Sequence, residues 1–324
     1  MIGIADIEAA AARLHGVVVR TPLLQNAELD RVTGGTVLVK PECFQQIGSF
    51  KIRGAYNLLS QLTPEQAAKG VVAWSSGNHA QGVALAGKLL GIHAAIVMPE
   101  DAPAAKLEST KRLGGEIITY DRYNEDREAI ARRVAAEREA EIVPSYEDER
   151  IIAGQGTAGL EIAQQAAELG LGIDKLLVCC GGGGLTAGCA IAIHAFYPDA
   201  EVYTVEPEDF DDTARSLAGG ERVANSPDAR SICDALLTDM PGQLTYDVMR
   251  EHINAGLTVS EADVREAMRF AFRNLKIVVE PGGAVGLAAL LAGKVDTAGK
   301  TTAIIFSGGN VDAGLFASIQ TERA

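Results

Sequence analysis

The sequence has 324 residues, of which 47% are hydrophobic and 22% are charged, so it predicts a sizeable folded core rather than a disordered chain. Its 29 basic and 43 acidic side chains give a formal net charge of −14, which argues against nucleic acid and membrane as partners because anionic phosphates would be repelled. No apolar run reaches the length of a membrane-spanning helix.

The cysteines and the N-terminus predict a cytoplasmic protein. The five cysteines are odd in number and show no metal-ligand spacing, which is typical of a reducing compartment. Cys179, Cys180 and Cys189 lie in apolar surroundings, where cysteine behaves as a small hydrophobic residue. The opening MIGIADIEAAAARLHG has early acids and helical spacing, so we expect a helix there and no signal peptide.

Short apolar runs alternate with longer amphipathic stretches along the chain. We expect strands at 71–74, 94–98, 116–119, 176–180, 201–205 and 302–306. We expect helices near 52–60, 79–90, 103–113, 124–139, 155–169, 185–196, 261–275 and 283–293. This alternation indicates the α/β class, with right-handed βαβ units and mainly parallel sheets. The polar segment 206–250 has little periodicity and is interpreted as a long functional loop.

The segments that directly follow four of these strands are unusual in composition. Ligands of parallel α/β sheets bind at the carboxyl ends of the strands, so these segments are expected to carry function. In chain order they read SSGNHAQG, GGGGL, EPEDFDD and SGGNVD.

The run Gly181–Gly184 lies between an expected strand and an expected helix. Glycines bring backbone N–H groups close to a ligand, and a helix N-terminus adds partial positive charge, which together predict a phosphate site. A tight turn is the alternative, but two glycines would satisfy it. The run matches neither a Walker loop nor the dinucleotide fingerprint, because neither spacing is present.

The segment Ser75–His79 offers hydroxyls and N–H groups that could bind a carboxylate. A helix N-cap would explain one or two of its residues but not all five. A lone His79 is more often structural than catalytic. After the last strand, the Ser307 hydroxyl could bond a ring nitrogen, although for this segment alone a turn with an N-cap is the better explanation.

The stretch GSFKIRGA places Lys51 in a tightly turning segment with few charges. A lysine has an ordinary pKa of about 10.4 and must lose its proton to form an imine, which partial burial favours. A lysine, a phosphate site, a carboxylate loop and a hydroxyl for a ring nitrogen are the parts that pyridoxal phosphate requires.

Six segments occur in an order that resembles one family. SFKIRGA, SSGNHAQG, IAGQGT, GGGGL, EPGGAVG and SGGNVD are similar to segments of the serine/threonine dehydratases and the related serine racemases, which are fold-type II pyridoxal phosphate enzymes. The resemblance runs from about residue 15 to the C-terminus. It implies two αβα lobes: a large cofactor-binding domain of 1–47 and 149–324, and a small mobile domain of 48–148. The cofactor would lie between them, and a homodimer is expected.

The resemblance also implies roles for the cofactor-binding residues. Lys51 would hold the cofactor covalently, Phe50 would pack beside its ring, and Asn78 would bond the ring hydroxyl. Ser307 would meet the pyridine nitrogen, where a neutral hydroxyl suits β-elimination better than transamination. The phosphate would be bound by Gly181, Gly182, Gly183, Gly184 and the backbone of Leu185.

By this resemblance, the expected activity is β-elimination on a small β-hydroxy amino acid, L-threonine or L-serine, giving a 2-oxo acid and ammonia. Lys51 would remove the Cα proton. The substrate carboxylate would be bound by Ser75, Ser76, Gly77, Asn78 and His79. Two alternatives stay open. Ser76 matches the serine that supplies a proton in serine racemases, and Arg127, if it reaches a second carboxylate, would favour L-threo-3-hydroxyaspartate.

The acidic segment EPEDFDD resembles a cation site of the racemases. Glu206, the carbonyl of Phe210 and Asp212 match its ligands, and such oxygen ligands suit Mg²⁺, Ca²⁺ or Mn²⁺. A solvated acidic loop is the alternative. Asp234 is expected near the rim of the active site. Its segment SICDAL departs from the usual TIADG at Cys233 and Ala235, which leaves the substrate preference open.

Overall fold

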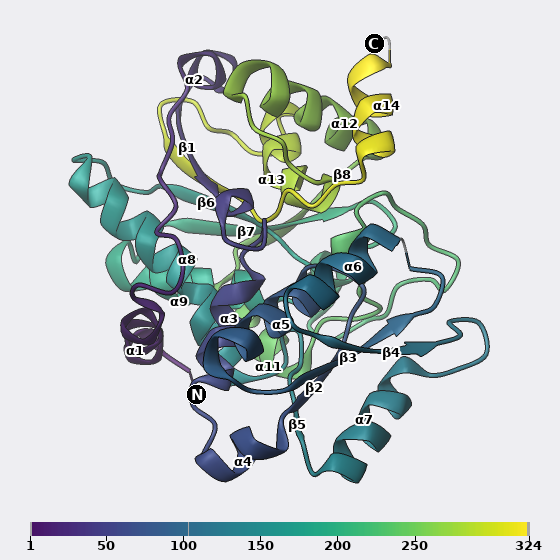
Figure 1. The fold of residues 1–324 in the computed structure, drawn as a ribbon. Helices are drawn as coiled ribbons and strands as arrows, with labels where there is room; N and C mark the ends of the chain where they lie inside the picture. The colour runs from purple at the N-terminus through teal and green to yellow at the C-terminus, as the bar shows by residue number, and fades with distance from the viewer. Residues whose placement is uncertain (1, 103, 323–324) are drawn as a thin grey trace.

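The computed structural model describes residues 2–102 and 104–322, and it contains two parallel sheets that are covered by helices on both faces (Figure 1). The strand order of the larger sheet is β1 (Thr36–Pro41), β9 (Thr301–Phe306), β6 (Lys175–Cys179), β7 (Glu201–Pro207) and β8 (Ala255–Val259). The order of the smaller sheet is β4 (Glu116–Tyr120), β3 (Ala94–Pro99), β2 (Val71–Trp74) and β5 (Glu141–Ile142). The predicted α/β class is confirmed.

Helices connect the strands and cover both sheets. The helices up to the end of the smaller sheet are α1 (Ile4–Leu14), α2 (Ala27–Thr33), α3 (Lys51–Leu59), α4 (Pro64–Lys69), α5 (Asn78–Leu90), α6 (Ala104–Arg112) and α7 (Arg127–Arg138), with a 3-10 turn η1 (Glu42–Phe44). Those that follow are α8 (Glu149–Glu168), α9 (Gly184–Phe196), α10 (Asp212–Gly219), α11 (Gln243–His252), α12 (Glu261–Phe270), α13 (Pro281–Leu291) and α14 (Ala313–Thr321), with the 3-10 turn η2 (Asp234–Leu236) and the short π-helix η3 (Ala271–Leu275).

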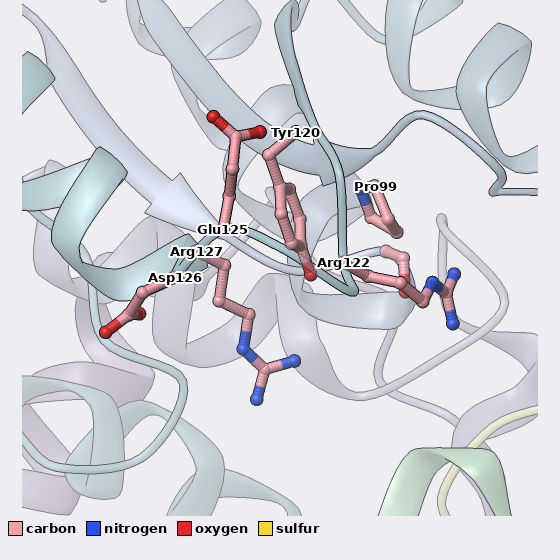
Figure 2. A pocket seen from close by; sticks show the side chains of 7 residues that line it. Pro99, Tyr120, Arg122, Glu125, Asp126 and Arg127 are labelled. Atoms are coloured by element: carbon pink, nitrogen blue, oxygen red, sulfur yellow. The ribbon is translucent and has the colours of Figure 1, made fainter.

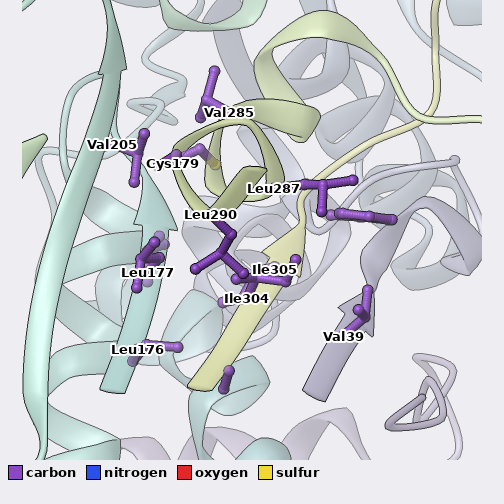
Figure 3. Close-up of a cluster of buried hydrophobic side chains, with 14 of the residues drawn as sticks. Val39, Leu176, Leu177, Cys179, Val205, Val285, Leu287, Leu290, Ile304 and Ile305 are labelled. Atoms are coloured by element: carbon purple, nitrogen blue, oxygen red, sulfur yellow. The ribbon is translucent and has the colours of Figure 1, made fainter. Parts of the chain in front are cut away.

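The central strands of the larger sheet are apolar on both faces because helices cover both of them. α13 packs on β6, β7, β8 and β9, and α9 packs on β6 from the other side (Figure 1). Leu177 and Ile304 are fully buried in neighbouring strands and pack with Val285 and Leu287 of α13 (Figure 3). This core fixes the carboxyl ends of the strands, where the candidate site lies.

Helix α3 lies at the junction of the two sheets, because it packs both on α5 and on α8. The approach to α8 depends on glycines. A Cβ added to Gly154 would lie 2.6 Å from the Cα of Gly54, which is closer than any real contact. The first residue of α3 is Lys51, so this packing positions the candidate catalytic lysine.

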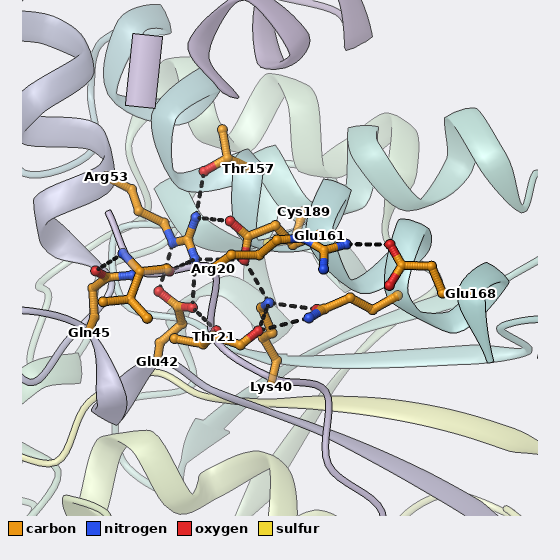
Figure 4. Close-up of polar contacts among 12 residues, drawn as sticks. Arg20, Thr21, Lys40, Glu42, Gln45, Arg53, Thr157, Glu161, Glu168 and Cys189 are labelled. Carbon is orange, nitrogen blue, oxygen red and sulfur yellow. Dashed lines mark hydrogen bonds and ion pairs between the residues drawn. The ribbon is translucent and has the colours of Figure 1, made fainter. Parts of the chain in front are cut away.

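A buried network of charges also positions α3 (Figure 4). Arg53 is fully buried and makes two hydrogen bonds to each of two carboxylates, those of Glu42 and Glu161, at distances from 2.7 to 2.9 Å. The ammonium group of the buried Lys40 lies 2.6 Å from Glu161. Bidentate contacts of this kind fix the planar guanidinium in one orientation. The network therefore ties α3 to η1, β1 and α8.

The six expected strands are present within one or two residues of the expected bounds. Three further strands were missed, β1, β5 and β8. The expectation of a long loop over 206–250 is wrong in part, because α10 and α11 form within it. The domain boundaries at 47/48 and 148/149 stay a prediction. Among the described residues, no helix is both long and apolar enough to cross a membrane.

Candidate active site

Two segments from opposite ends of the sequence pair at the carboxyl end of β9. The N–H of Phe50 donates to the carbonyl of Ser307 at 3.1 Å, and the N–H of Gly309 donates to the carbonyl of Gly48 at 2.9 Å. Ser49 and Gly308 form an isolated antiparallel bridge between these bonds. The pairing brings the start of α3, where Lys51 lies, next to the end of β9, where Ser307 lies.

The side chain of Lys51 is mostly buried. Its Nζ donates to the carbonyl oxygen of Ser145 at 3.1 Å and lies 5.1 Å from the centre of the Phe50 ring. Burial lowers the pKa of Lys51 to about 8, although the charge of Glu280 opposes the shift. A much larger fraction of this amine is therefore neutral near pH 7 than of a surface lysine, as a nucleophile or base requires.

Ser307 is buried at the end of β9, and its hydroxyl lies near the Cys179 thiol at the end of β6 and lowers the pKa of that thiol. Burial raises the pKa of Cys179 to about 11, so the group stays a neutral thiol. From sequence, Cys179 was interpreted only as a small core residue. Its contact with Ser307 follows from β6 and β9 being neighbours in the sheet.

The glycine run forms the turn between β6 and α9. Gly183 has a φ of 93°, which favours glycine, and a Cβ added to Gly182 would lie 2.1 Å from the ring of Tyr146. The Thr245 hydroxyl donates to the carbonyl of Gly182 at 2.6 Å and holds the turn from α11. Tyr146 and Thr245 were not found from sequence, since their contacts with the turn are tertiary.

This turn fits a phosphate group. No side chain caps the N-terminus of α9. The first N–H groups of the helix therefore receive no acceptor from a capping side chain. The helix dipole adds partial positive charge at the same point. Pyridoxal phosphate needs N–H donors for its phosphate and a lysine for its aldehyde. The glycine turn and the N-terminus of α9 supply the first, and the buried lysine supplies the second.

The segment from Ser75 to His79 joins β2 to α5. The N–H of Gly77 donates to the Ser75 hydroxyl at 3.2 Å, while the Ser76 hydroxyl has no hydrogen-bond partner within the part of the chain that the structure describes. Because Gly77 caps α5 without a side chain, the segment presents backbone N–H groups and hydroxyls. This is chemistry suited to a carboxylate.

His79 is held as a structural histidine. Its Nε2 lies 2.9 Å from the carbonyl oxygen of Val143, and a carbonyl can only accept, so Nε2 carries the proton. Burial, with the charge of Lys51, lowers the pKa of His79 to about 3, so the ring is neutral at ordinary pH. A contact between the His79 side chain and substrate stays a prediction.

Asn78 lies in a chain of hydrogen bonds that includes Glu280, a residue to which the sequence assigned no role. Asn78 Nδ2 donates to Glu280 Oε1 at 2.7 Å, and Asn310 Nδ2 donates to Asn78 Oδ1 at 2.7 Å. Glu280 is buried directly before α13. Burial raises the pKa of Glu280 to about 7. The EPGGAVG segment was the available signal, but a carboxylate there also fits an exposed helix start.

A cavity of about 360 Å³ opens beside the carboxylate loop. Ser76 lines it together with Arg127 and Arg122 (Figure 2). Arg122 forms an ion pair with Asp101 at 2.7 Å, whereas Arg127 has no ion pair with any described residue. Figure 2 shows the carboxylate of Glu125 pointing away from both guanidinium groups. Asp126, which also lines the cavity, accepts the N–H groups of Glu128 and Ala129 at the start of α7. The cavity therefore offers one guanidinium group without an ion pair, that of Arg127, next to the loop.

Two of the candidate cation ligands are buried carboxylates at the end of β7. Glu206 accepts the N–H groups of Thr213 and Ala214 at 3.0 and 2.8 Å, while the Oδ2 atom of Asp212 is buried without a partner. Burial and the nearby Asp212 raise the pKa of Glu206 to about 8, and burial raises that of Asp212 to about 6. Such a pair fits a cation.

The described residues gather no group of three or more His, Cys, Asp or Glu side chains for a metal ion. A cation here would therefore need the carbonyl of Phe210 and water as further ligands, which suits Mg²⁺ or Ca²⁺. At the rim, Asp234 of η2 forms an ion pair with Lys106 of α6 at 2.8 Å, and this pair connects the two sheet layers.

The sequence and the fold both match known proteins. Residues 14–308 match the family described as "Pyridoxal-phosphate dependent enzyme". The chain is 45% identical to an L-threo-3-hydroxyaspartate ammonia-lyase of Pseudomonas sp, over 97% of each protein. It is similar to the crystal structure of a threonine deaminase of T.th., with a TM-score of 0.90 and 41% identity over 96% of this chain and 99% of that one. It is also similar to maize serine racemase, with a TM-score of 0.92 and 40% identity over 98% and 96%.

Proposed function

Because the chain belongs to the family of pyridoxal-phosphate dependent enzymes, and is a lyase of the ammonia-lyase type, we propose that its substrate is a β-hydroxy amino acid with a second carboxylate. The expected reaction removes water from 3-hydroxyaspartate and releases oxaloacetate and ammonia. The observation that carries this choice is Arg127, which shares a cavity with Ser76 and has no ion pair among the described residues. A relative at 45% identity carries the same activity in its name.

Different residues of the chain bind the cofactor and transfer the proton in this reaction. The turn Gly181–Gly184 with the N-terminus of α9 would hold the phosphate of the cofactor, and the Ser307 hydroxyl would contact its ring nitrogen. Pyridoxal phosphate, when bound, withdraws electrons from the Cα atom of an amino acid and so makes its proton acidic. Lys51, whose pKa lies at about 8, takes that proton as a general base.

Two groups orient the substrate. The loop of Ser75 and Ser76, with the N-terminus of α5, binds the α-carboxylate through hydroxyls and N–H groups. Arg127 binds the β-carboxylate through two hydrogen bonds from its planar guanidinium. Such a bidentate contact fixes the orientation of the substrate and also balances the charge of its carboxylate. With both carboxylates held, the Cα–H bond is kept toward Lys51.

The test compares three substrates. We expect the loaded protein to release 2-oxo acid faster from L-threo-3-hydroxyaspartate than from L-threonine or L-serine at equal concentration. Arg127→Gln should lower kcat/KM for hydroxyaspartate by about 10- to 100-fold, the size of a lost charged hydrogen bond, and leave L-threonine nearly unchanged. Arg132→Gln, on the same helix but paired with Glu128, is the control. Equal loss on both substrates would contradict the role of Arg127.

Serine or threonine dehydration, with serine racemisation, is the second candidate. Ser76 favours it, because its hydroxyl lines the cavity and has no hydrogen-bond partner in residues 2–102 and 104–322. Such a hydroxyl can give or take a proton. Formation of D-serine from L-serine, lost in Ser76→Ala while 2-oxo acid release persists, would support this function.

The divalent cation is a further part of the proposal. Glu206, the carbonyl of Phe210 and Asp212 would hold Mg²⁺, Ca²⁺ or Mn²⁺, which offsets the repulsion between the two buried carboxylates. Adding each cation to chelator-treated protein should raise its thermal midpoint, and Asp212→Asn should remove the response. An equal rise in Asp212→Asn would exclude this site.

We propose a cytoplasmic homodimer in which the small domain of 48–148 moves against the rest of the chain. Large apolar side chains are exposed near the end of β9, including Phe44 at 48% and Val278 at 44%. Val278 and Cys43, the residue before Phe44, flank Gly309, because a Cβ added there would contact both of them. Light scattering of the wild type and of Val278→Asp tests whether this surface joins two copies.

A further inference from the structure

The orientation of the Asn78 amide is determined by a backbone carbonyl at some distance from it. Asn310 Nδ2 donates to the carbonyl oxygen of Ile47 at 2.8 Å, and a carbonyl oxygen can only accept. The same nitrogen donates its second hydrogen to Asn78 at 2.7 Å, so the atom of Asn78 on that side must be Oδ1. The Asn78 Nδ2 group is therefore turned toward Glu280.

Glu280 completes this orientation. Its Oε1 accepts from Asn78 Nδ2 at 2.7 Å, and the nearby backbone N–H of Asn310 also favours the ionised carboxylate. The carboxylate does not cap its own helix, although Glu280 is the N-cap residue of α13. A Cβ on Gly308 would lie 2.2 Å from Oε1, so glycine at this position leaves the space that Glu280 occupies.

One hydrogen of Asn78 Nδ2 remains. Its oxygen is occupied by Asn310 and its other hydrogen by Glu280, and the structure gives the last hydrogen no acceptor among the described residues. On the side away from Asn310, Asn78 can therefore offer one N–H donor to a ligand. This donor stabilises a deprotonated, anionic oxygen, which accepts the hydrogen bond. It does not stabilise a hydroxyl that needs an acceptor for its own hydrogen.

We propose that Glu280 is a positioning residue which, through Asn78, presents a single N–H donor to the ring oxygen of the cofactor and so holds that oxygen as an anion. This inference rests on the proposed function, because Asn78 is placed at the ring oxygen only by the proposed cofactor site. Glu280 itself does not touch the reacting atoms. Its effect is on the charge distribution of the ring against which Lys51 works.

The charges around Glu280 determine the pH range in which it acts. Burial, with the charge of Asp234, raises the pKa of Glu280, while the bond from Asn78 and the charge of Lys106 oppose the shift. Lys51 and the thiols of Cys43 and Cys179 also face this carboxylate. Both of its donors favour the ionised form, so the positioning is strongest above neutral pH.

The test follows the visible absorbance of cofactor-loaded protein from pH 6 to pH 10. In Glu280→Ala, Asn78 loses the acceptor that fixes it, so the pH at which the ring oxygen loses its proton should rise by about one unit. The dissociation constant of the cofactor should rise about tenfold. Glu280→Gln retains an oxygen acceptor and should shift much less. Glu266→Ala, an exposed carboxylate paired with Arg269, is the control and should not shift at all.

The double variant decides whether Glu280 acts through Asn78. In an Asn78→Ala background, Glu280→Ala should cause no further shift, because the group that it orients is gone. A full additional shift would overturn the inference. In cofactor-free protein, Glu280→Ala should also lower the thermal midpoint, since it leaves the partly buried N–H donor of Asn78 without a partner. An unchanged midpoint would contradict the bond to Asn78.

Two further results separate the possible failures. If Glu280→Ala does not fold, Asn310→Asp tests the same chain of bonds, because a carboxylate cannot donate to Asn78 Oδ1, and the same upward shift is expected. A coloured wild type with unshifted variants overturns this inference alone. A wild type that takes up no cofactor overturns the proposed function together with it.

Discussion

Lys51 illustrates how burial alone changes the chemistry of a common side chain. Its pKa falls to about 8 because the surrounding protein excludes water from the ammonium form, while the charge of Glu280 limits the fall. The neutral amine is the form that attacks an aldehyde. Lowering the pH below about 8 therefore protonates Lys51 and removes the nucleophile.

The rate of cofactor uptake should follow this titration. We expect the rate at which cofactor-free protein becomes coloured to rise between pH 7 and pH 9 and to level off above, and not to continue rising toward pH 10.5. Stopped-flow absorbance at constant ionic strength measures it. Lys51→Ala should stay colourless at every pH. A rate that still rises tenfold per pH unit at pH 9 would show that the amine keeps an ordinary pKa.

At the scale of single residues, the sequence singled out those that lie in an unusual local pattern. Lys51, Ser76 and Gly181–Gly184 lie in segments of unusual composition. Glu280 and Tyr146 were not predicted, because their contacts with Asn78 and Gly182 depend on folding. An isolated acid or aromatic side chain carries no local pattern that distinguishes a buried partner from a surface residue.

At the scale of elements, the buried network around Arg53 ties α3 to three other elements. Arg53 has no exposed surface and contacts both Glu42 and Glu161. Removing the arginine leaves Glu42 without its ion-pair partner and Glu161 with Lys40 alone, in surroundings where a lone charge is costly. The network therefore matters for the position of Lys51 two residues earlier.

We predict that Arg53→Ala lowers the free energy of unfolding by about 3–5 kcal/mol, as breaking a buried pair does. Removing the exposed pair of Arg20 and Glu168, by Arg20→Ala, should cost less than about 1 kcal/mol. Urea unfolding of the two variants measures the contrast. Equal small losses would mean that Arg53 does not need its partners to stay buried.

The missed elements have local causes. β1 contains Lys40, whose charge interrupts the apolar run although the side chain is fully buried. β5 is only two residues long, and β8 is an edge strand with partly exposed residues, so neither gives a clear pattern. α10 and α11 were hidden by the acidic and polar residues around them. The strongly apolar strands were predicted because they are buried on both faces.

For the whole molecule, the ion pair of Lys106 and Asp234 connects the two sheet layers at the rim of the site. Both side chains are partly exposed, so the pair contributes little to global stability. It can still determine how often α6 separates from η2, because local opening requires far less free energy than unfolding.

We expect Lys106→Ala to speed hydrogen exchange of the amides in α6 severalfold while leaving the urea midpoint nearly unchanged. Mass spectrometry of exchange, peptide by peptide, measures the first and urea titration the second. Lys111→Ala, at the exposed end of the same helix, is the control. A fall in the urea midpoint with no change in the hydrogen exchange of α6 would contradict this prediction. It would mean that the pair contributes to global stability and not to the local contact between α6 and η2.

The order of strands in the larger sheet has a consequence for the time at which this protein gains its chemistry. β9 is the last strand in the sequence, yet it lies between β1 and β6. While the chain is being synthesised, Lys51 has left the ribosome long before Ser307 has been added, and it remains an ordinary solvated amine. Only insertion of β9 encloses it beside Phe50 and Ser307. Attachment of the cofactor is therefore a late event of biosynthesis, and the colour of the protein marks a finished chain.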